Sequence, residues 1–388
     1  MKPPNIAFVR QRYVYHGGAE QILVRTIAAL QRDGAQVSIV TRRWQPAGQE
    51  MSQRAYICNP FYLGRLWRDW SFACSACRLL PTLDVDLVQS HERIPCCDIY
   101  RAGDGVHAEW LAQRARSRGK LSRLATLASP YHRYLLHAER RLFASEKLRA
   151  VICNSRMVRD EVRRWFGVPE HKLHVIYNGV DTAKFNPDLR RHRAEVRERH
   201  AIPPDATLFL FVGAGFERKG LRQALGALGC LPAGAFLLIV GKDKQAPTFV
   251  HHAHRLGLSS RVRFVGGQPD VTPFYGAADA FVMPTLYDPF PNAVLEAMAA
   301  GLPVVTSLKC GAAEQIENGR NGYVCDALDI DAVADAMRAL LEPQRRGAMA
   351  VAARSAAEPL TLAAMSGELL RLYRSLLPGS ESGDGNRP

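Results

Sequence analysis

The sequence lacks a long hydrophobic run. None of the apolar stretches in its 388 residues reaches the roughly 18 to 20 residues that a membrane-spanning helix requires. The first residues, MKPPNIAFVR, also lack the apolar segment and small-residue cleavage site of a signal peptide. We therefore expect a protein that stays in the cytosol, and the length favours two domains over one hydrophobic core.

Residues that are spaced as metal ligands are also scarce. The nine cysteines are scattered along the chain, and only Cys74 and Cys77 have the separation of a zinc-binding pair. No second CxxC or HxxxH pattern supplies the other ligands that a tetrahedral zinc site needs. We expect reduced, mostly buried thiols, no metal and no other cofactor.

Acidic residues are scarce in the first half of the chain. Residues 1–200 contain 34 Lys and Arg against 19 Asp and Glu, whereas the remaining residues contain 17 against 18. Such an excess attracts polyanions, and nucleic acid, anionic lipid and a phosphorylated glycan are the three candidates. Because no recognisable reading motif accompanies the basic residues and the second half is neutral, we expect no nucleic-acid partner.

What the chain has in abundance is apolar, β-branched runs that alternate with helical patterns. Strands are predicted at 5–9, 36–40, 86–89 and 149–154, and in the later runs TLFLFVG, AFLLIVG, VRFVGG, DAFVMPT and LPVVTS. Continuous apolar runs joined by helical crossovers are typical of parallel sheets covered on both faces. The sequence therefore predicts two successive Rossmann-like α/β domains, with a boundary near residues 180–200, close to the charged, proline-bearing stretch at 188–206.

Ligands of such sheets bind beyond the carboxyl ends of the strands. After the first strand, Gly17 and Gly18 open a helix and let backbone N–H groups approach an oxyanion, although a tight helix-entry turn explains the pair equally well. In the second half, Arg218 and Lys219 stand between glycines before a helix. Because cations oppose the helix macrodipole there, an anionic ligand explains them better than an exposed basic turn.

The stretch PTLYDPFPNAVLEAMAAGLPVV carries two prolines and two acids around a predicted helix start. We expect Asn292 to cap this helix, so that Ala293 to Leu295 present N–H groups to a diphosphate. Glu296 would then accept hydrogen bonds from ribose hydroxyls, and Asp288 would reach a sugar beyond the phosphates. A surface acid with ordinary capping would not need this combination of residues.

A fourth segment, RAGDGVHAEW, places Asp104 and His107 on a glycine-rich loop. Either side chain can bind hydroxyls of a donor or of an acceptor. The alternative for Asp104 is an Asx-turn or helix cap, and the alternative for His107 is a packing role at a helix start.

These motifs resemble the retaining glycosyltransferases of family 4, which have the GT-B fold. Asp288 and Glu296 have the family's spacing between two acids, although the family usually begins with Glu, and Arg218 and Lys219 match its cation pair. Within the family, the glucosyltransferases that start the outer core of lipopolysaccharide are the most similar. That likeness rests on GGAEQILVRTIAALQRDGAQVSIVTRRW, IYRAGDGVHAEWLAQ, GAGFERKGLRQALGAL and VGKDK.

The resemblance implies roles for individual residues. The implied donor-binding residues are Gly17, Gly18, Arg218, Lys219, Asp288, Phe290, Pro291, Asn292, Ala293 and Glu296. The implied catalytic residues are Asp104, Arg218, Lys219 and Asp288. Asp104 and His107 are the candidates for acceptor binding.

The resemblance also implies an activity and a domain plan. A hexose would pass with retention and without a metal from a nucleotide-diphosphate sugar to a glycan acceptor such as lipopolysaccharide core. UDP-glucose, UDP-galactose, UDP-N-acetylglucosamine and GDP-mannose remain open as donors. The expected plan is an acceptor domain at 1–185, a nucleotide-sugar domain at 186–358, a helix at 359–378 that crosses back to the first domain, and a disordered tail at 379–388. The two parallel sheets would face a central cleft.

Residues 110–149 combine dense arginine with Trp110, Tyr131 and Tyr134 at helical spacing. This pattern predicts a basic amphipathic surface for the anionic inner membrane, and hence a peripheral protein that meets a lipid-linked glycan. A charged outer face on packed helices is the alternative. Two other functions remain open: a nucleotide-sugar epimerase of the same fold, which would turn over donor without acceptor, and a different bacterial surface-polysaccharide glycosyltransferase.

Overall fold

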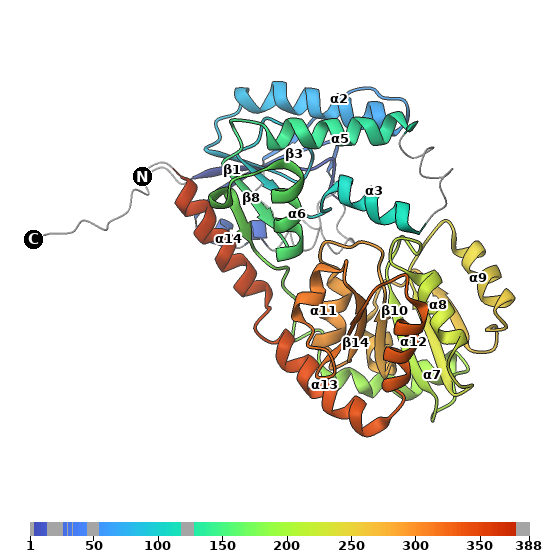
Figure 1. Cartoon of the computed structure of the whole chain (residues 1–388). Coiled ribbons are helices and arrows are strands. Elements are labelled where there is room, and N and C mark those ends of the chain that lie inside the picture. The colour runs from blue at the N-terminus through green and yellow to red at the C-terminus, as the bar shows by residue number, and fades with distance from the viewer. Residues whose placement is uncertain are drawn as a thin grey trace, which may run out of the picture. The chain divides into compact units, whose positions relative to one another are not determined.

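The structure is a computed structural model of the whole chain (Figure 1). It describes residues 4–13, 26–28, 30–32, 34–44, 54–117 and 128–377. These residues belong to two compact units, the first containing residues 1–177 and 362–388 and the second containing residues 178–361. The predicted tail at 379–388 and the glycines Gly17 and Gly18 lie outside the described residues.

The first unit contains a seven-stranded parallel sheet. In order across the sheet, its strands are β5 (Arg54–Ile57), β3 (Gln36–Thr41), β1 (Asn5–Val9), β6 (Leu87–Ser90), β7 (Ile99–Arg101), β8 (Ala150–Cys153) and β9 (Leu173–Val175). A separate short ribbon pairs β2 (Arg12–Tyr13) with β4 (Arg43–Trp44). Helices in the described part of this unit include α2 (Gly64–Leu79), η1 (Leu80–Thr82), α3 (His107–Arg116), α5 (Pro130–Phe143), α6 (Arg156–Phe166), η2 (Glu170–Lys172) and α14 (Leu362–Leu376).

Both faces of this sheet are buried, which explains its apolar strands. Alternate side chains of β1 enter different cores: Ala7 and Val9 pack with residues of α2, α5 and α6, whereas Ile6 and Phe8 pack with residues of α14. The four strands predicted in this half are confirmed. β5 and β9 were missed because edge strands are less completely buried, and β7 because it is only three residues long.

Helix α14 returns to the first unit, as the fold class predicts. Leu369 and Tyr373 are buried in the same core as Phe8 of β1, and the rings of Phe8 and Tyr373 meet edge to face at 6.4 Å. The Tyr373 hydroxyl donates to Gln89 Oε1 on β6 at 2.6 Å. A polar contact inside an apolar interface fixes the position of the helix along the sheet.

The chain passes between the units at 177–178 and 361–362, whereas the sequence places these divisions at 185–186 and 358–359. In the second unit, the Val180 N–H donates to the Leu360 carbonyl at 2.8 Å, and Val180 forms a parallel bridge with Thr361. Both crossings therefore leave the second unit from one paired position.

The second unit contains a six-stranded parallel sheet. Its strands, in order across the sheet, are β12 (Val262–Gly266), β11 (Ala235–Val240), β10 (Thr207–Val212), β13 (Ala280–Met283), β14 (Val304–Ser307) and β15 (Gly322–Cys325). Its helices are η3 (Pro187–His192), α7 (Arg193–Arg199), α8 (Leu221–Gly229), α9 (Ala246–Arg255), α10 (Thr272–Ala277), α11 (Asn292–Ala299), η4 (Gly311–Gln315), α12 (Ile330–Ala339) and α13 (Pro343–Ala357). The prediction of two parallel-sheet, Rossmann-like domains is confirmed. No helix among the described residues is long and apolar enough to cross a membrane.

The charged stretch at 188–206 is part of the second unit and not a linker. It forms η3 and α7, whose Leu189 and Val196 are buried. Arg197 is also buried and pairs with the buried Asp279 at 2.6 Å, while the Asp279 carboxylate accepts from the Leu208 N–H at the start of β10. This ion pair ties α7 to two central strands.

We predict that Arg197→Ala lowers the free energy of unfolding by about 1 to 3 kcal/mol, because the buried Asp279 Oδ2 loses its guanidinium donor and only Arg193, 2.9 Å from Oδ1, stays paired with the carboxylate. Urea unfolding of the full chain, followed by circular dichroism, measures the change. Arg199→Ala is the matched control, since Arg199 lies on the same helix but pairs with Glu195 at the surface. Equal effects of the two substitutions would show that the buried pair does not stabilise the unit.

Candidate active site

The cation pair lies in the turn between β10 and α8. Gly220, just before α8, has a φ of +77°, and a Cβ there would lie 1.8 Å from the Pro284 carbonyl oxygen. The turn can therefore approach the loop after β13 only with glycine at this position. The Arg218 carbonyl accepts a hydrogen bond from the Leu286 N–H at 2.8 Å, which joins the turn to that loop.

Both cations converge on one carboxylate. Asp288 Oδ2 lies 3.0 Å from Arg218 Nη1 and 3.1 Å from Lys219 Nζ. Burial by itself would raise the pKa of Asp288, but the charges of Lys219 and Arg218 outweigh it, and the pKa is lowered below its ordinary value. Oδ1, the other oxygen of the carboxylate, makes neither contact. The site therefore holds two cations, one anion and an oxygen that can accept from a hydroxyl.

The backbone of Asp288 is also held in place. Its N–H donates to the Lys309 carbonyl, and its carbonyl accepts from the Gly311 N–H, both at 2.9 Å. The loop that follows β13 is thus fixed against the segment that follows β14. These are neighbouring strands of the sheet, so the site lies where ligands of parallel sheets bind.

Helix α11 begins one residue earlier than the sequence suggests. Pro291 is its N-cap and Asn292 its first residue, so the prediction that Asn292 caps the helix is wrong. The reason is a side-chain contact: Asn292 Oδ1 accepts from Asn178 Nδ2 at 2.9 Å, and Asn178 Nδ2 also donates to the Phe290 carbonyl. The Asn292 side chain is occupied there and does not cap. The Val294 N–H donates to the Pro291 carbonyl at 3.1 Å, so the N–H groups of Asn292 and Ala293 are the ones at this helix start that lack a partner within the helix.

Glu296 lies one turn into α11. Its Oε2 accepts a hydrogen bond from the Tyr275 hydroxyl at 2.7 Å, and burial raises the pKa of Glu296 above its ordinary value. Sequence reasoning missed both Tyr275 and Asn178. Neither belongs to a charged or glycine-rich motif, and their contacts with the site depend on the packing of α10 and of the chain entering the second unit.

The second unit therefore brings together the predicted residues Arg218, Lys219, Asp288, Phe290, Pro291, Asn292, Ala293 and Glu296 around one turn, one loop and the start of α11. The glycines Gly17 and Gly18, which were expected beside the phosphates, lie outside the described residues.

The first unit contains a cavity of about 350 Å³ at the carboxyl ends of its strands. Described residues that line it follow β1, β6 and β7 or lie on α2 and α5; they are Arg10, Gln11, Arg12, Arg68, Asp69, Phe72, Ala73, Glu92, Arg93, Ile94, Asp104, Tyr131, Tyr134 and Leu135. Its size and its convergent polar groups are those of a small-molecule site.

Hydrogen bonds order the polar side of this cavity. Gln11 Nε2 donates to Asp69 Oδ1 at 3.1 Å and to Glu92 Oε2 at 3.2 Å, and the Tyr131 hydroxyl donates to Asp69 Oδ2 at 3.1 Å. Burial raises the pKa of Glu92, and the nearby Asp104 raises it further. Clustered carboxylates beside aromatic rings suit a ligand with several hydroxyl groups.

The structure separates the two residues of the segment RAGDGVHAEW. Asp104 is exposed and lines the cavity. His107 is buried and lies outside the cavity lining, with its Nε2 3.0 Å from His132 Nδ1. Burial and neighbouring cations lower the pKa of His107 to about 3, so the ring is neutral at physiological pH. The geometry supports the packing alternative for His107.

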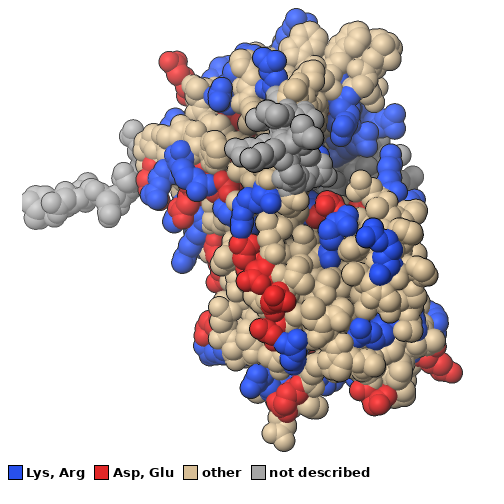
Figure 2. Space-filling view, turned by 45° about the vertical axis from the view of Figure 1, so that its right-hand side comes forward, with Lys and Arg blue, Asp and Glu red and all other residues tan. Residues whose placement is uncertain are grey.

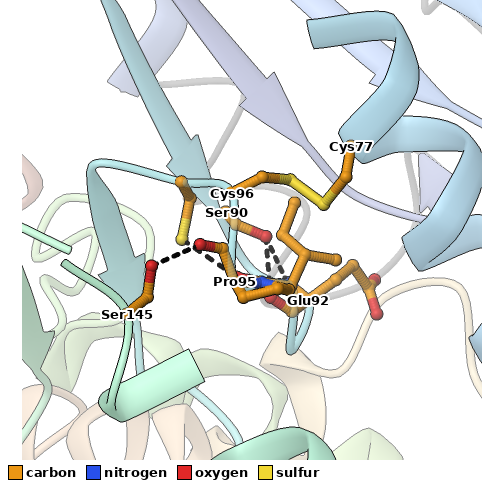
Figure 3. The surroundings of a disulfide bond; sticks show 8 residues. Cys77, Ser90, Glu92, Pro95, Cys96 and Ser145 are labelled. Carbon is orange, nitrogen blue, oxygen red and sulfur yellow. Dashed lines mark hydrogen bonds between the residues drawn. A yellow bond between two sulfur atoms is a disulfide. The ribbon is translucent and has the colours of Figure 1, made fainter. Parts of the chain in front are cut away.

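A disulfide joins Cys77 of α2 to Cys96, which precedes β7 (Figure 3). The expectation that all thiols are reduced is therefore wrong. The two residues are 19 apart in sequence and meet only because α2 packs over the end of the sheet, a contact that spacing does not reveal. The disulfide also means that Cys77 cannot act with Cys74 as a pair of metal ligands. No three His, Cys, Asp or Glu side chains in the described part of the chain form a metal-holding group.

The disulfide links two walls of the cavity. Asp69 and Phe72 lie on α2, and Glu92 and Arg93 lie on the segment that leads to Cys96. Further hydrogen bonds hold that segment (Figure 3). The Ser90 hydroxyl donates to the Glu92 carbonyl at 2.7 Å and accepts from the Glu92 N–H at 2.9 Å, and the Ser145 hydroxyl donates to the Pro95 carbonyl at 2.6 Å.

Comparisons with known proteins match both units. The family described as "Glycosyltransferase Family 4" matches residues 16–184, and the family described as "Glycosyl transferases group 1" matches residues 192–356. The lipopolysaccharide glucosyltransferase WaaG of Escherichia coli K12 is 27% identical over 82% of this chain and 84% of its own length. The crystal structure of WaaG, a glycosyltransferase involved in lipopolysaccharide biosynthesis, superposes with a TM-score of 0.82, at 23% identity, over 97% of this chain and 100% of that one.

A second solved structure, Anabaena HepE in complex with UDP and glucose, has a TM-score of 0.70 at 20% identity and covers 96% of this chain and 100% of that one. The fold is therefore GT-B. The chain belongs to the glycosyltransferases that combine the family 4 and group 1 domains. It is a glycosyltransferase, as the resemblance implies.

We predict that Asp288→Asn lowers the free energy of unfolding at neutral pH by about 1.5 to 3 kcal/mol, because Arg218 and Lys219 lose a charged acceptor. The pKa of Asp288 is lower in the folded than in the unfolded chain, so its stabilising effect is present above the ordinary aspartate pKa. It disappears as pH falls through the lowered folded value. Urea unfolding across this range should show the difference between wild type and variant shrinking toward acid pH. Asp331→Asn, at an exposed position of α12, is the control. A difference that is independent of pH would contradict the ion-pair explanation.

Proposed function

We propose that the protein transfers a hexose from a UDP-hexose to a glycan acceptor of lipopolysaccharide core, with retention of anomeric configuration and without a metal. The observation that carries this proposal is the meeting of Arg218 and Lys219 at Asp288, beside the first turn of α11. The name of WaaG, a lipopolysaccharide glucosyltransferase, supports the choice of acceptor. The UDP and glucose in the HepE structure support the choice of donor.

The cations and the helix start are suited to the diphosphate of the donor. Lys219 is only 12% exposed, whereas Arg218 is 37% exposed and so remains accessible to a ligand. A diphosphate that binds both cations would add two negative charges where free N–H groups of α11 also concentrate positive potential. In the free protein, Asp288 partly neutralises this potential and keeps both side chains oriented.

The remaining donor contacts follow from the same geometry. Glu296 lies one turn along α11 from the helix start, so that its carboxylate can accept from ribose hydroxyls next to the diphosphate. Asp288 Oδ1 can accept from a hydroxyl of the transferred hexose. Phe290 to Ala293 form the loop and helix start between these two acids and would enclose the sugar.

In the transfer step, the bond between the anomeric carbon and the phosphate oxygen breaks while the acceptor oxygen bonds to the same carbon from the same face. The departing diphosphate oxygen takes the proton of the acceptor hydroxyl. Arg218, Lys219 and the N-terminus of α11 stabilise the charge that develops on the leaving group, the task that a metal ion performs in other enzymes.

The acceptor would bind in the cavity of the first unit. Its carboxylates Asp69, Glu92 and Asp104 can accept from sugar hydroxyls, and Tyr131 and Tyr134 offer aromatic faces. We assign Asp104 to the acceptor because it is exposed at the lining of this cavity. We propose that the acceptor is lipid-linked and that the protein works as a peripheral protein at the anionic inner face of the cytoplasmic membrane.

The structure changes how residues 110–149 can contribute to membrane binding. Tyr131 and Tyr134, expected on a membrane-facing side, line the cavity. Arg114 contacts His132 at 3.3 Å and Arg116 donates to Gln113. Arg118, Lys120 and their neighbours at 118–127 lie outside the described residues. Of the aromatic residues expected on this surface, Trp110 lies outside the cavity lining and is partly exposed.

We predict that Glu296→Gln weakens UDP binding by about 1.5 to 3 kcal/mol, because the ribose hydroxyls lose a charged acceptor. A thermal-shift screen of the four candidate nucleotide sugars first identifies the donor. Titration calorimetry with the matching nucleotide then measures the affinity. Glu317→Gln, at an exposed position of the same unit, should leave it unchanged. An unaltered affinity of Glu296→Gln would remove Glu296 from the donor site.

We predict that Lys219→Ala and Arg218→Ala each lower turnover by about 10² or more, because each removes a charge that stabilises the leaving group. Release of nucleotide from the donor in the presence of a delipidated core oligosaccharide measures turnover, and EDTA should not reduce it. Arg255→Ala, at the exposed end of α9, is the control. Full activity of both variants, or turnover that EDTA abolishes, would refute the metal-free mechanism, and donor turnover without acceptor would favour the epimerase.

A further inference from the structure

Helix α2 presents one face to the cavity and another to the surface. Arg68, Asp69, Phe72 and Ala73 line the cavity of the first unit. Leu63, Leu66, Trp67 and Trp70 follow the i, i+3, i+4, i+7 spacing of a single helix face, and they are exposed by 68%, 36%, 39% and 51%. Phe61 and Ile57, on the segment before the helix, are exposed by 71% and 58%. We call these six residues the α2 patch.

The fold holds the α2 patch in place. Arg42 is buried, and its guanidinium donates to Asn59 Oδ1 at 3.2 Å, to the Pro60 carbonyl at 2.9 Å and to Ser71 Oγ at 2.8 Å. The segment that carries Phe61 and Leu63 is thus fastened to α2 by a buried charge. The ring of Phe61 meets the ring of Trp67 edge to face at 5.6 Å. Apolar side chains that are both exposed and fixed mark an interaction surface.

The charge around the α2 patch is positive. Between residues 54 and 79, the chain contains four arginines and a single acid, Asp69. Asp69 lies in the cavity lining and bonds to Arg68 and Tyr131, whereas Arg54, Arg65 and Arg78 are exposed. Figure 2 shows that, among the charged side chains, lysine and arginine also predominate over the visible face of the first unit. Aromatic and aliphatic side chains with arginines around them suit the interface of an anionic bilayer.

We propose that the α2 patch docks on an anionic lipid surface, with the apolar side chains inserted at the level of the headgroups and Arg54, Arg65 and Arg78 above them. Helix α2 lies along the outer side of the first unit, next to α5 (Figure 1). Because its other face lines the cavity, docking brings the cavity beside the membrane. In this respect the inference rests on the proposed function, since the acceptor would then be an amphiphile that is anchored in the bilayer while its saccharide enters the cavity.

A second copy of the chain is the other occupant to consider. A two-fold symmetric contact through the α2 patch would bring identical surfaces together. The exposed arginines around the patch would then face arginines of the partner, with no acid of the same segment outside the cavity to offset them. A lipid surface supplies both the apolar phase and the negative charge that the patch lacks.

Two pairs of substitutions with matched exposure test the docking. Phe61→Ser with Leu63→Ser changes the α2 patch, and Leu308→Ser with Val351→Ser removes side chains that are exposed by 64% and 69% in the second unit. Co-sedimentation with vesicles of phosphatidylethanolamine and phosphatidylglycerol should fall by about 100-fold or more for the first pair, since each side chain gives up its apolar contact. The second pair should bind as the wild type does. Equal sedimentation of the two variants would overturn the proposal.

A variant with altered charge and a measurement of the oligomeric state complete the test. Gln in place of Arg54, Arg65 and Arg78 should weaken binding to these vesicles by about 100-fold, while vesicles of phosphatidylcholine alone should bind wild type weakly. Bromine-labelled acyl chains should quench the fluorescence of wild type more than that of a variant with Trp67→Phe and Trp70→Phe. If the patch variant changed the molar mass in light scattering but not the vesicle binding, the patch would be a contact between copies, and the proposal would be wrong.

The design separates this inference from the proposed function. UDP affinity belongs to the second unit and should be unchanged in the Phe61 and Leu63 variant. Transfer to a delipidated, water-soluble oligosaccharide should persist in that variant, while transfer to the same saccharide on its lipid anchor in vesicles should fall with the binding. Loss of vesicle binding in a protein that transfers no sugar would refute the proposed function and leave the docking surface standing. Sugar transfer by the Phe61 and Leu63 variant, with vesicle binding equal to that of wild type, would refute the docking surface and leave the proposed function standing.

Discussion

Burial of both faces of a parallel sheet is the constraint on which the rest of this structure depends. In the first unit, alternate residues of β1 enter separate cores, so neither face of the strand is left for polar chemistry. The polar groups collect instead where the strands end. The cavity of the first unit follows β1, β6 and β7, and the cation pair and Asp288 of the second unit follow β10 and β13. The same arrangement therefore produces one candidate site in each unit.

In the second-unit site, opposite charges stabilise each other in the absence of a ligand. A buried carboxylate without a partner would be costly, and so would two adjacent cations beside a helix N-terminus. Asp288 and the pair Arg218 and Lys219 offset each other, which lowers the pKa of Asp288 despite its burial. On the proposed function, a diphosphate would offer the cations a stronger anion in the same place. Its binding would then exchange one set of charged hydrogen bonds for another beside a loop whose backbone is already bonded on both sides.

Much of the fold could be predicted from local pattern, because every long buried strand is a continuous apolar run. β5, β7, β9 and β15 were not predicted, since short or edge strands with mixed side chains carry no such signal. The second-unit site was also predictable, because its charged residues sit in two short motifs. Its neutral partners Asn178 and Tyr275 were not, as they reach the site only through tertiary packing. The same limit explains the misplaced cap at Asn292, the unexpected bridge from Cys77 to Cys96, and the first-unit cavity, of which only Asp104 was anticipated.

Helix α2 connects these observations in the first unit. Its buried side contributes Phe72 and Ala76 to the core, a second side contributes Arg68 and Asp69 to the cavity, and a third side exposes Trp67 and Trp70. Arg42 bonds to the segment before the helix and to Ser71 in its middle, and the disulfide at Cys77 holds its last turn. A helix restrained at its middle and at one end holds its faces at fixed angles to the rest of the unit. If the exposed side meets a bilayer, the orientation of the cavity toward that bilayer is consequently set by the fold itself, and an anchored acceptor needs no further guidance than the plane of the membrane.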